Sequence, residues 1–477
     1  MEDPRPDIIL IVTDQQRYDT IRALGASHMD TPNIDRLVAQ GVSFDQCHVT
    51  APSCVPSRAS LFSGYYPHTN GVLANGTEWS RTWVSDLADA GYHCVNIGKM
   101  HTIPYDAKAG FHERYVVENK DRFLEGRWFT DEWDKAILNA GHQKPGRLSY
   151  RARDDYRQAL GAFEWSLDDR LHSDSFIGGF TEWWLDTKPM EKPLFLSIGF
   201  PGPHPPYDPT PEYAEKYMAR DVPVPHVSQD ELNRLPPPWQ EKRRHDNAFD
   251  HDAVHWNLDP SEAELHRMRA FYYANVEMID REVGRILDAL ERRGRLEQSV
   301  IIFTSDHGDN LGDHGLSQKW APYEQVTRVP MVVSQPGRFP ARRFDGLVQL
   351  FDLGPTILEL AGLTPDDSFE ARSLLDILEG RSDAARSHVY CEQGGDPSMT
   401  GADMVTMIRS RRHKLVAFLG QDYGQLFDLE ADPGETHDLW DAPGAAQIKA
   451  DLLGELGRWH QQSAYRTRRA RAQMMDA

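Results

Sequence analysis

The chain has 477 residues, which is longer than one hydrophobic core usually supports, so we expect one large domain and one smaller domain. Hydrophobic residues make up 40% and charged residues 26% of the sequence, a globular composition that excludes wholesale disorder. The formal net charge is −21; such an acidic surface repels nucleic acid and anionic membranes, which excludes both as partners, and any site for an anionic substrate must supply its own cations.

Four short apolar runs predict strands that are buried on both faces of a sheet. They are rich in β-branched side chains and lack the alternation of a half-exposed strand; they cover residues 8–13, 92–97, 194–198 and 300–304. Helical patterns lie between them, for example over residues 262–293. Strands that alternate with helices predict an α/β fold with a doubly wound, mostly parallel sheet flanked by helices.

Each of these four runs ends in a cluster of polar side chains. Ligands of doubly wound sheets bind at the carboxyl ends of the strands, so we expect the clusters to lie along one edge. Residues 201–260, rich in proline, histidine and charge, predict a long excursion over that edge. The candidate residues at the strand ends are Asp14, Gln15, Lys99, His101, His204, Asp306 and His307.

The pattern changes near residues 376–387, where a smaller domain is expected to begin. Short alternating runs predict antiparallel strands, followed by a helix over about 445–463; the runs cover residues 388–391, 404–409, 414–418 and 425–429. We therefore expect a large α/β domain over residues 1–380 and a small α+β domain over residues 381–477.

Two carboxylates, Asp14 and Asp306, end separate strands and stand beside Gln15 and His307. Oxygen ligands suit Ca²⁺ or Mg²⁺, and an imidazole also admits Mn²⁺. Alternatively, Asp14 caps the following helix and Asp306 begins a turn, as acidic residues after strands often do. The spacing alone leaves both interpretations open.

Residues 54–58 read Cys-Val-Pro-Ser-Arg. A lone cysteine near a proline is usually a small buried hydrophobic residue, but the longer pattern resembles the motif of the type I sulfatases, members of the alkaline-phosphatase superfamily. In that family a formylglycine-generating enzyme oxidises the motif cysteine to formylglycine (3-oxoalanine). Pro56 and Arg58 match the positions which that enzyme reads, whereas the family's downstream Thr-Gly is Ser63-Gly64 here.

The resemblance covers essentially the whole chain and includes further landmarks in the family's order. These are residues 31–37, 68–72, 98–101, 204–206, 305–308, Lys319 and 426–435.

The resemblance implies hydrolysis of aryl or alkyl sulfate monoesters through a covalent sulfo-enzyme intermediate. Hydrated formylglycine at position 54 offers two hydroxyls: one, activated by the metal, attacks sulfur, and the other, once deprotonated, expels sulfate by re-forming the aldehyde. The implied metal is Ca²⁺, with Mn²⁺ or Mg²⁺ as alternatives, and its implied ligands are Asp14, Gln15, residue 54, Asp306 and His307.

The resemblance also implies roles for the remaining polar residues. Arg58 would fix the diol, and His101 would be the base of the second step. Lys99 and Lys319 would neutralise the sulfate oxygens, and His204, with Lys319, would protonate the leaving oxygen. These cations form the positive site that the acidic surface requires.

Each of these residues has an ordinary structural alternative. The lysines could lie on the surface after a strand, and the histidines could be satisfied by hydrogen bonds. Asn75 could contact a sulfate oxygen or only serve a turn.

The sequence departs from many arylsulfatases at two of the implied metal ligands. Those enzymes carry Asp-Asp and Asp-Asn where this chain has Asp14-Gln15 and Asp306-His307; the variants here resemble the choline-sulfatase and phosphonate monoester hydrolase branch. Phosphonate monoester hydrolases tend to lack the Gly-Lys-x-His element found at residues 98–101. We therefore expect a sulfatase with a side activity on phosphate or phosphonate esters, and keep a phosphonate monoester or phosphodiester hydrolase as the alternative.

Two alternatives belong to other functional classes. A phosphotransferase or mutase of the same superfamily would need a serine or threonine nucleophile, which Cys54 does not provide. A non-catalytic binding protein would retain Cys54 as an unmodified thiol.

Aromatic side chains in or near loops could wall a pocket for an aryl or quaternary-ammonium group, or they could simply pack. They are Trp79, Trp83, Trp128, Tyr207 and Trp256.

The remaining expectations concern the setting of the protein. Four scattered cysteines do not form a disulfide framework, and no apolar stretch approaches the roughly 18 to 20 residues of a membrane span. Residues 1–7 lack the basic region of a secretion signal, so we expect a cytoplasmic protein. The chain length and the aromatic loops permit a homodimer or tetramer.

Overall fold

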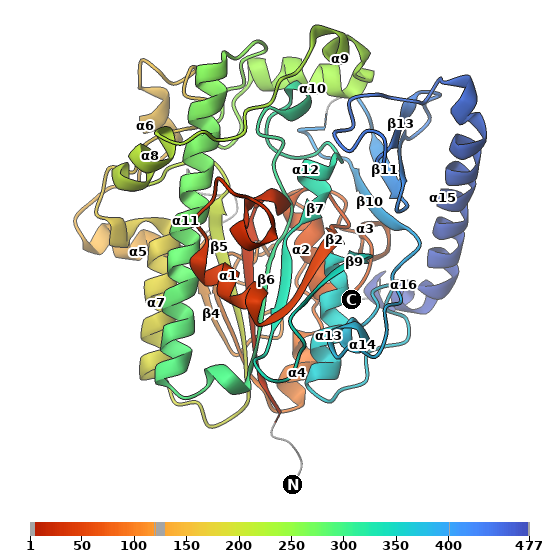
Figure 1. Cartoon of the computed structure of the whole chain (residues 1–477). Coiled ribbons are helices and arrows are strands. Elements are labelled where there is room, and N and C mark those ends of the chain that lie inside the picture. The colour runs from red at the N-terminus through yellow and green to blue at the C-terminus, as the bar shows by residue number, and fades with distance from the viewer. Residues whose placement is uncertain (1–4, 119, 121–128, 400, 476–477) are drawn as a thin grey trace.

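The computed structural model describes residues 5–118, 120, 129–399 and 401–475. Within these residues, nine strands form one large sheet near the centre of the molecule (Figure 1). The four predicted strands are β1 (Asp7–Asp14), β3 (His93–Gly98), β5 (Leu194–Pro203) and β6 (Ser299–Ser305). The strands that the apolar runs did not predict are β2 (Gly41–His48), β4 (Glu113–Val116), β7 (Arg328–Val329), β8 (Met331–Ser334) and β9 (Arg342–Gln349).

The four predicted strands are neighbours in the sheet, in the order β3-β5-β1-β6, and all of them run parallel. Their carboxyl ends therefore lie side by side at one edge, where ligands of parallel sheets bind. Antiparallel pairing enters beyond β6, through β8 and β2. The mostly parallel α/β sheet predicted from the sequence is confirmed.

Both faces of the sheet are covered by helices, because consecutive residues of a strand point to opposite faces. In β1, Ile8, Leu10 and Val12 belong to one buried cluster, and Ile9 and Ile11 belong to another. The first face is covered by α2 (Cys54–Ser63), α4 (Val84–Asp89), α13 (Leu353–Leu360) and α14 (Leu375–Leu378). The second is covered by α1 (Pro32–Ala39), α5 (Glu132–Asn139), α7 (Ser173–Thr187) and α11 (Glu262–Arg292).

Residues 201–260 contain more regular structure than the predicted excursion. Three helices form here: α8 (Pro211–Met218), α9 (Gln229–Arg234) and α10 (Pro237–Ala248). Two of them have proline in the first turn, where its missing N–H is harmless. The sequence did not predict these helices because few of their residues are apolar. The other short helices are α3 (Pro67–Asn70), α6 (Arg147–Arg151) and α12 (Glu324–Thr327).

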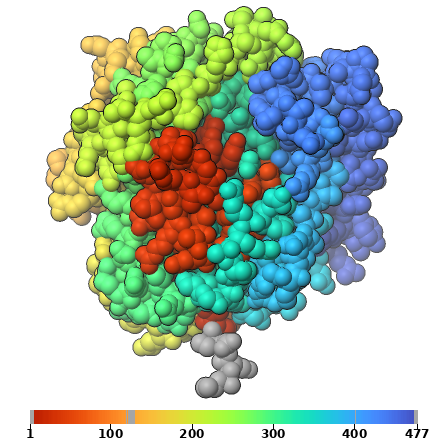
Figure 2. Space-filling model, in the orientation of Figure 1, coloured from red at the N-terminus to blue at the C-terminus, as the bar shows by residue number. Residues whose placement is uncertain are grey.

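The C-terminal residues form a separate four-stranded antiparallel sheet, as predicted. Its strands are β10 (Val389–Gly394), β11 (Met404–Arg409), β12 (His413–Phe418) and β13 (Gly424–Asp428). Two helices follow, α15 (Ala446–Arg466) and α16 (Arg468–Met475). This part lies directly against the rest of the molecule along one side (Figure 2). The boundary near residue 380 stays a prediction.

No helix within the described ranges is long and apolar enough to cross a membrane.

Candidate functional site

The polar residues predicted at four strand ends lie together at one edge of the sheet. Asp14 is the last residue of β1, and Asp306 directly follows β6. Gln15 and His101 have positive φ angles of 72° and 61°, a backbone conformation that only sharp turns impose on non-glycine residues. These turns lie just beyond the ends of β1 and β3, where the chain leaves the sheet.

Cys54 is the first residue of α2, and its side chain points into this cluster. Its Sγ lies 3.1 Å from Lys319 Nζ and 3.2 Å from His307 Nε2. Asp14 Oδ1 lies 3.8 Å from the same sulfur atom. Only 2% of Cys54 is exposed, so a group formed at this position meets polar side chains rather than bulk water.

The cluster contains a donor set that fits a divalent cation. One potential ligand atom from each of Asp14, Cys54, Asp306 and His307 lies within 4.8 Å of the others, and all four residues are buried. His307 Nδ1 bonds the carbonyl oxygen of Gly308 at 2.8 Å, which leaves Nε2 to face the site. Two carboxylates and one imidazole match the ligands of Ca²⁺, Mg²⁺ or Mn²⁺.

Gln15 adds a fifth donor because its amide is held in one orientation. Its Nε2 donates to Asp309 Oδ2 at 2.7 Å, and its Oε1 accepts from Lys319 Nζ at 3.0 Å. The oxygen therefore faces the cluster. Asp309 also accepts a hydrogen bond of 2.8 Å from the Tyr207 hydroxyl. The sequence analysis did not assign Asp309, although it lies three residues beyond Asp306.

Three cationic side chains surround the same point: Arg58, Lys99 and Lys319. Arg58 donates to Asp306 Oδ2 at 2.7 Å, and Lys99 Nζ lies 2.7 Å from Asp14 Oδ2. Burial alone would raise the pKa of Asp14, but Lys99, His204 and Arg58 outweigh it and hold that pKa well below its usual range. Burial would lower the pKa of Lys99, yet Asp14 outweighs it and raises the pKa. The cluster therefore keeps its charges despite burial, as an anion site requires.

The two candidate histidines differ in their surroundings. His204 Nδ1 bonds the carbonyl oxygen of Pro205 at 2.8 Å, and its Nε2 lies 2.9 Å from Lys319 Nζ. His101 Nδ1 is buried without a hydrogen-bond partner in the described structure. Burial, followed by the charge of Lys99, holds the pKa of His101 well below its usual range. His101 is therefore neutral at neutral pH and can accept a proton.

Two further acidic residues contact these histidines and were missed in the sequence. Glu118 accepts the backbone N–H of His101 at 3.1 Å, and burial raises the pKa of Glu118 to about 7. Asp252 Oδ2 lies 3.4 Å from His204 Nε2. Asp252 and Ala253 both have positive φ angles and form the centre of a two-residue turn. Glu118 lies two residues beyond β4, a strand that the apolar runs did not predict, and Asp252 lies in a turn, so the rule used for the other residues did not find them.

Asn75 lies beside the start of α2. Its Oδ1 accepts the backbone N–H of Val55 at 3.1 Å, and its own N–H donates to Asp396 Oδ2 at 3.2 Å. Asn75 therefore holds the turn that presents Cys54, and its side chain lies next to the cluster.

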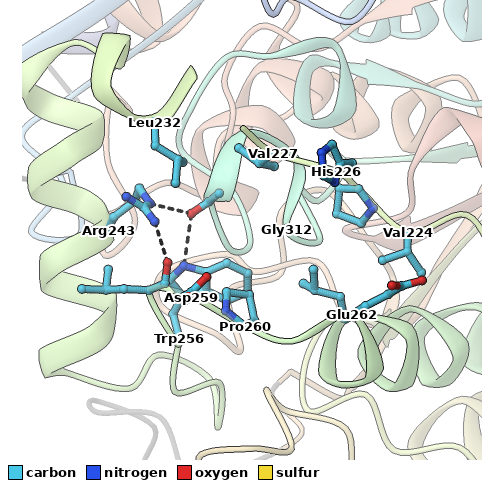
Figure 3. A pocket seen from close by; sticks show the side chains of 14 residues that line it. Val224, His226, Val227, Leu232, Arg243, Trp256, Asp259, Pro260, Glu262 and Gly312 are labelled. Atoms are coloured by element: carbon cyan, nitrogen blue, oxygen red, sulfur yellow. Dashed lines mark hydrogen bonds between the residues drawn. The ribbon is translucent and has the colours of Figure 1, made fainter. Parts of the chain in front are cut away.

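Most of the aromatic residues proposed as pocket walls are packing residues. Trp83 and Tyr207 are buried, and Trp79 donates from Nε1 to the carbonyl oxygen of His101 at 2.8 Å. Trp256 lines a separate cavity of about 300 Å³ that also contains Arg243 (Figure 3). Trp128 lies outside the described residues.

Comparisons with known proteins agree with this geometry. Residues 6–363 match the sequence model of the sulfatase family, and residues 312–462 match that of the C-terminal region of N-sulphoglucosamine sulphohydrolase. An arylsulfatase of Clostridium perfringens is 30% identical over 449 residues, which cover 91% of this chain and 90% of the relative. A choline-sulfatase of Rhizobium meliloti is 27% identical over 94% of this chain and 85% of its own length.

The fold is likewise shared with solved structures. The phosphonate monoester hydrolase of Agrobacterium radiobacter superposes with a TM-score of 0.82 at 23% identity, covering 96% of each chain. At that identity the likeness shows the fold alone.

Proposed function

This chain is a hydrolase of the sulfatase family, and we propose that it hydrolyses sulfate monoesters with a formylglycine formed from Cys54. The observation that carries the proposal is the position of Cys54: its Sγ lies within 3.2 Å of both Lys319 Nζ and His307 Nε2. A structural cysteine would lie among apolar side chains, as Cys47 does.

The nucleophile and the metal are the two groups that this site would acquire. Hydrated formylglycine supplies two hydroxyls on one carbon, one to take up the sulfuryl group and one to release it. A divalent cation held by Asp14, Gln15, Asp306 and His307 would supply positive charge beside them. We propose Ca²⁺, with Mn²⁺ and Mg²⁺ as the alternatives, because oxygen donors predominate.

The cations of the chain bind and orient the sulfate group. Lys99 and Lys319 are buried, so their charges act in a region of low dielectric and stabilise negative charge that develops on the sulfate oxygens. Arg58 is fixed by Asp306 and by the carbonyl oxygen of Lys99, and it holds the hydroxyls of residue 54 in place. Asn75, beside α2, contacts a sulfate oxygen.

The two histidines transfer protons on opposite sides of the reaction. His204 Nε2 lies 2.9 Å from Lys319 Nζ, and a proton held by this pair is donated to the departing alcohol oxygen. His101 Nδ1 is buried without a hydrogen-bond partner in the described structure, so it is available to take the proton from the second hydroxyl as the aldehyde re-forms.

The choice of sulfate over phosphonate rests on Lys99 and His101. Gln15 and His307 are neutral donors, so a cation bound here would be more electrophilic toward either substrate than one held only by carboxylates. Phosphonate monoester or phosphodiester hydrolysis at the same site is the second candidate, because a tetrahedral phosphonate or phosphate group can bind the same cations.

Other proposals concern the setting of the enzyme. The substrate is a small sulfate ester, and maturation requires a formylglycine-generating enzyme. We also propose a cytoplasmic location and a homo-oligomer.

The test compares initial rates on 4-nitrophenyl sulfate and on a matched aryl phosphonate monoester. The expected result is faster sulfate turnover that Cys54→Ala abolishes, while Cys47→Ala, a buried cysteine away from the cluster, retains it. Peptide mass spectrometry should show an aldehyde oxygen in place of sulfur at position 54. Faster phosphonate turnover would overturn the assignment, and a quantitatively unmodified thiol in an active enzyme would exclude formylglycine.

A further inference from the structure

We propose that His68, Glu392 and His460 form a second metal site, selective for Zn²⁺, that joins the C-terminal helix α15 to the catalytic part of the chain. The three residues come from α3, β10 and α15. This inference does not depend on the proposed function, because none of the three belongs to the Cys54 cluster.

The three side chains converge although they are far apart in the sequence. One ligand atom from each lies within 4.8 Å of the other two. His68 Nδ1 lies 2.6 Å from Glu392 Oε1, and the rings of His68 and His460 are 5.0 Å apart in an edge-to-face arrangement. Tetrahedral zinc places its ligand atoms about 3.3 Å apart, so small side-chain shifts that separate His68 from Glu392 and bring His460 to the same point would complete a site.

The cluster contains a buried group that nothing in the described structure satisfies. Glu392 is fully buried, and its Oε2 has no hydrogen-bond partner among the described residues. A buried, unsatisfied carboxylate oxygen is unfavourable, and a bound cation would satisfy it. Within the described part of the chain, neither ring nitrogen of His460 makes a hydrogen bond, so this imidazole is available as a ligand.

The surroundings of His68 match those of a metal-binding histidine. If Nδ1 binds the metal, Nε2–H donates to Ser463 Oγ, which lies 2.6 Å away. Metal-binding histidines usually donate their second N–H in this way, which fixes the ring. The backbone N–H of His68 donates to Glu392 Oε1 at 2.8 Å and orients the carboxylate.

The ligand types distinguish this site from the others. Two imidazoles and one carboxylate are a known ligand set for Zn²⁺, whereas the Cys54 cluster is dominated by oxygen donors that suit harder cations. A third group, His245, Asp246 and His251, also converges. Its carboxylate is already bonded by Lys242 and Ser317, so we expect no ion there.

The experiment counts zinc in the full-length protein after EDTA treatment, incubation with excess ZnCl₂ and desalting. We expect His460→Gln to retain one equivalent of zinc fewer than the wild type, and His245→Gln to retain the wild-type number. Cobalt added in place of zinc should give visible d–d absorption that His460→Gln loses. The rate on 4-nitrophenyl sulfate should be the same in all three proteins, because these histidines lie outside the catalytic cluster.

Equal zinc content in the wild type and His460→Gln would overturn the inference. Far-UV circular dichroism checks that the variant is folded, and Glu392→Gln, which keeps the side-chain shape, provides a second variant with the same expected loss. If no sulfate ester is hydrolysed, the proposed function fails while the zinc count still tests this site.

Discussion

Gln15 shows how a neutral side chain becomes a directed ligand. An amide can present either its oxygen or its nitrogen to a cation, and only the oxygen can bind. Asp309 selects the oxygen by accepting the N–H of the amide at 2.7 Å. Residues that accept the second N–H of a metal-binding histidine fix the orientation of its ring in the same way.

Asp309→Ala should therefore weaken metal binding without removing a ligand. Loss of the hydrogen bond frees the Gln15 amide to rotate, and we expect the metal concentration that half-saturates activity to rise about 10- to 100-fold. The measurement is activity against added Ca²⁺ or Mn²⁺ after chelation. Tyr207→Phe removes only the second hydrogen bond to the same Asp309 oxygen and should have a smaller effect. An unchanged metal requirement in Asp309→Ala would refute this role.

Glu118 links the site to the pH dependence of stability. Burial raises its pKa from an ordinary value of 4.5 to about 7. Between these values the native state holds a proton that the unfolded chain has lost, so this group makes stability fall as pH rises from about 4.5 to 7. A shift of this size corresponds to at most about 3 kcal/mol.

Glu118→Gln cannot ionise, so the fall in stability that Glu118 causes between about pH 4.5 and 7 should be absent from the variant. Urea midpoints at pH 5 and pH 8 measure the effect: relative to the wild type, the variant should gain stability at pH 8 more than at pH 5. Glu297→Gln, on an exposed turn, is the control and should retain the wild-type pH dependence. Identical pH profiles for Glu118→Gln and the wild type would show that Glu118 is ionised in the native state.

At the scale of elements, β3 and β5 approach one another closely beside the site because each carries a glycine there. A Cβ atom on Gly199 would lie only 1.9 Å from the carbonyl oxygen of Lys99, and one on Gly98 would lie 2.1 Å from that of Gly199. The backbone N–H of Lys99 donates to Gly199 at 2.8 Å. This contact between β3 and β5 places Lys99 beside Asp14.

Gly199→Ala should displace Lys99 and lower kcat/KM for an aryl sulfate by about 100-fold, since small misplacements of catalytic groups have effects of this size. Overpacking should also destabilise the fold by about 1–3 kcal/mol. Gly457→Ala, in open space on α15, is the matched control and should stabilise the helix by about 0.5–1 kcal/mol. Full activity in Gly199→Ala would show that the close approach is not required.

On the scale of the whole molecule, buried ion pairs join the C-terminal sheet to Glu324 of α12, in the part of the chain that carries the large sheet. Arg409 of β11 bonds both carboxylate oxygens of Glu324, at 3.1 and 3.3 Å, and Lys414 lies 3.3 Å from the same residue. Burial alone would raise the pKa of Glu324, but Arg409 and Lys414 outweigh it and hold that pKa well below its usual range. Removing one partner from such a group is costly, because a buried charge is left undercompensated.

Arg409→Met should lower the stability of the whole chain by about 3 kcal/mol. The two sheets share this interface, so calorimetry should show one transition that shifts as a unit. Arg411→Met removes an exposed ion pair with Asp345 and should leave the midpoint unchanged. A separate early transition of the C-terminal part would show that the two sheets unfold independently.

The local elements and the chemical types at the site could be predicted from the sequence alone. Apolar runs predicted β1, β3, β5 and β6, because strands buried on both faces leave an uninterrupted pattern. The C-terminal strands and α15 were predicted from alternation and helical periodicity. The Cys-Val-Pro-Ser-Arg segment and the polar residues at the strand ends indicated the sulfatase family, which the comparisons confirm.

The contacts between residues could not be predicted in this way, because they depend on how distant segments pack. The mixed part of the sheet, with β2, β7, β8 and β9, depends on pairing between segments hundreds of residues apart. Asp309, Glu118 and Asp252 act through contacts with Gln15, His101 and His204, and the cluster of His68, Glu392 and His460 joins three distant elements. The periodicity of apolar residues indicates which face of an element is buried, but it does not indicate which residues that face contacts.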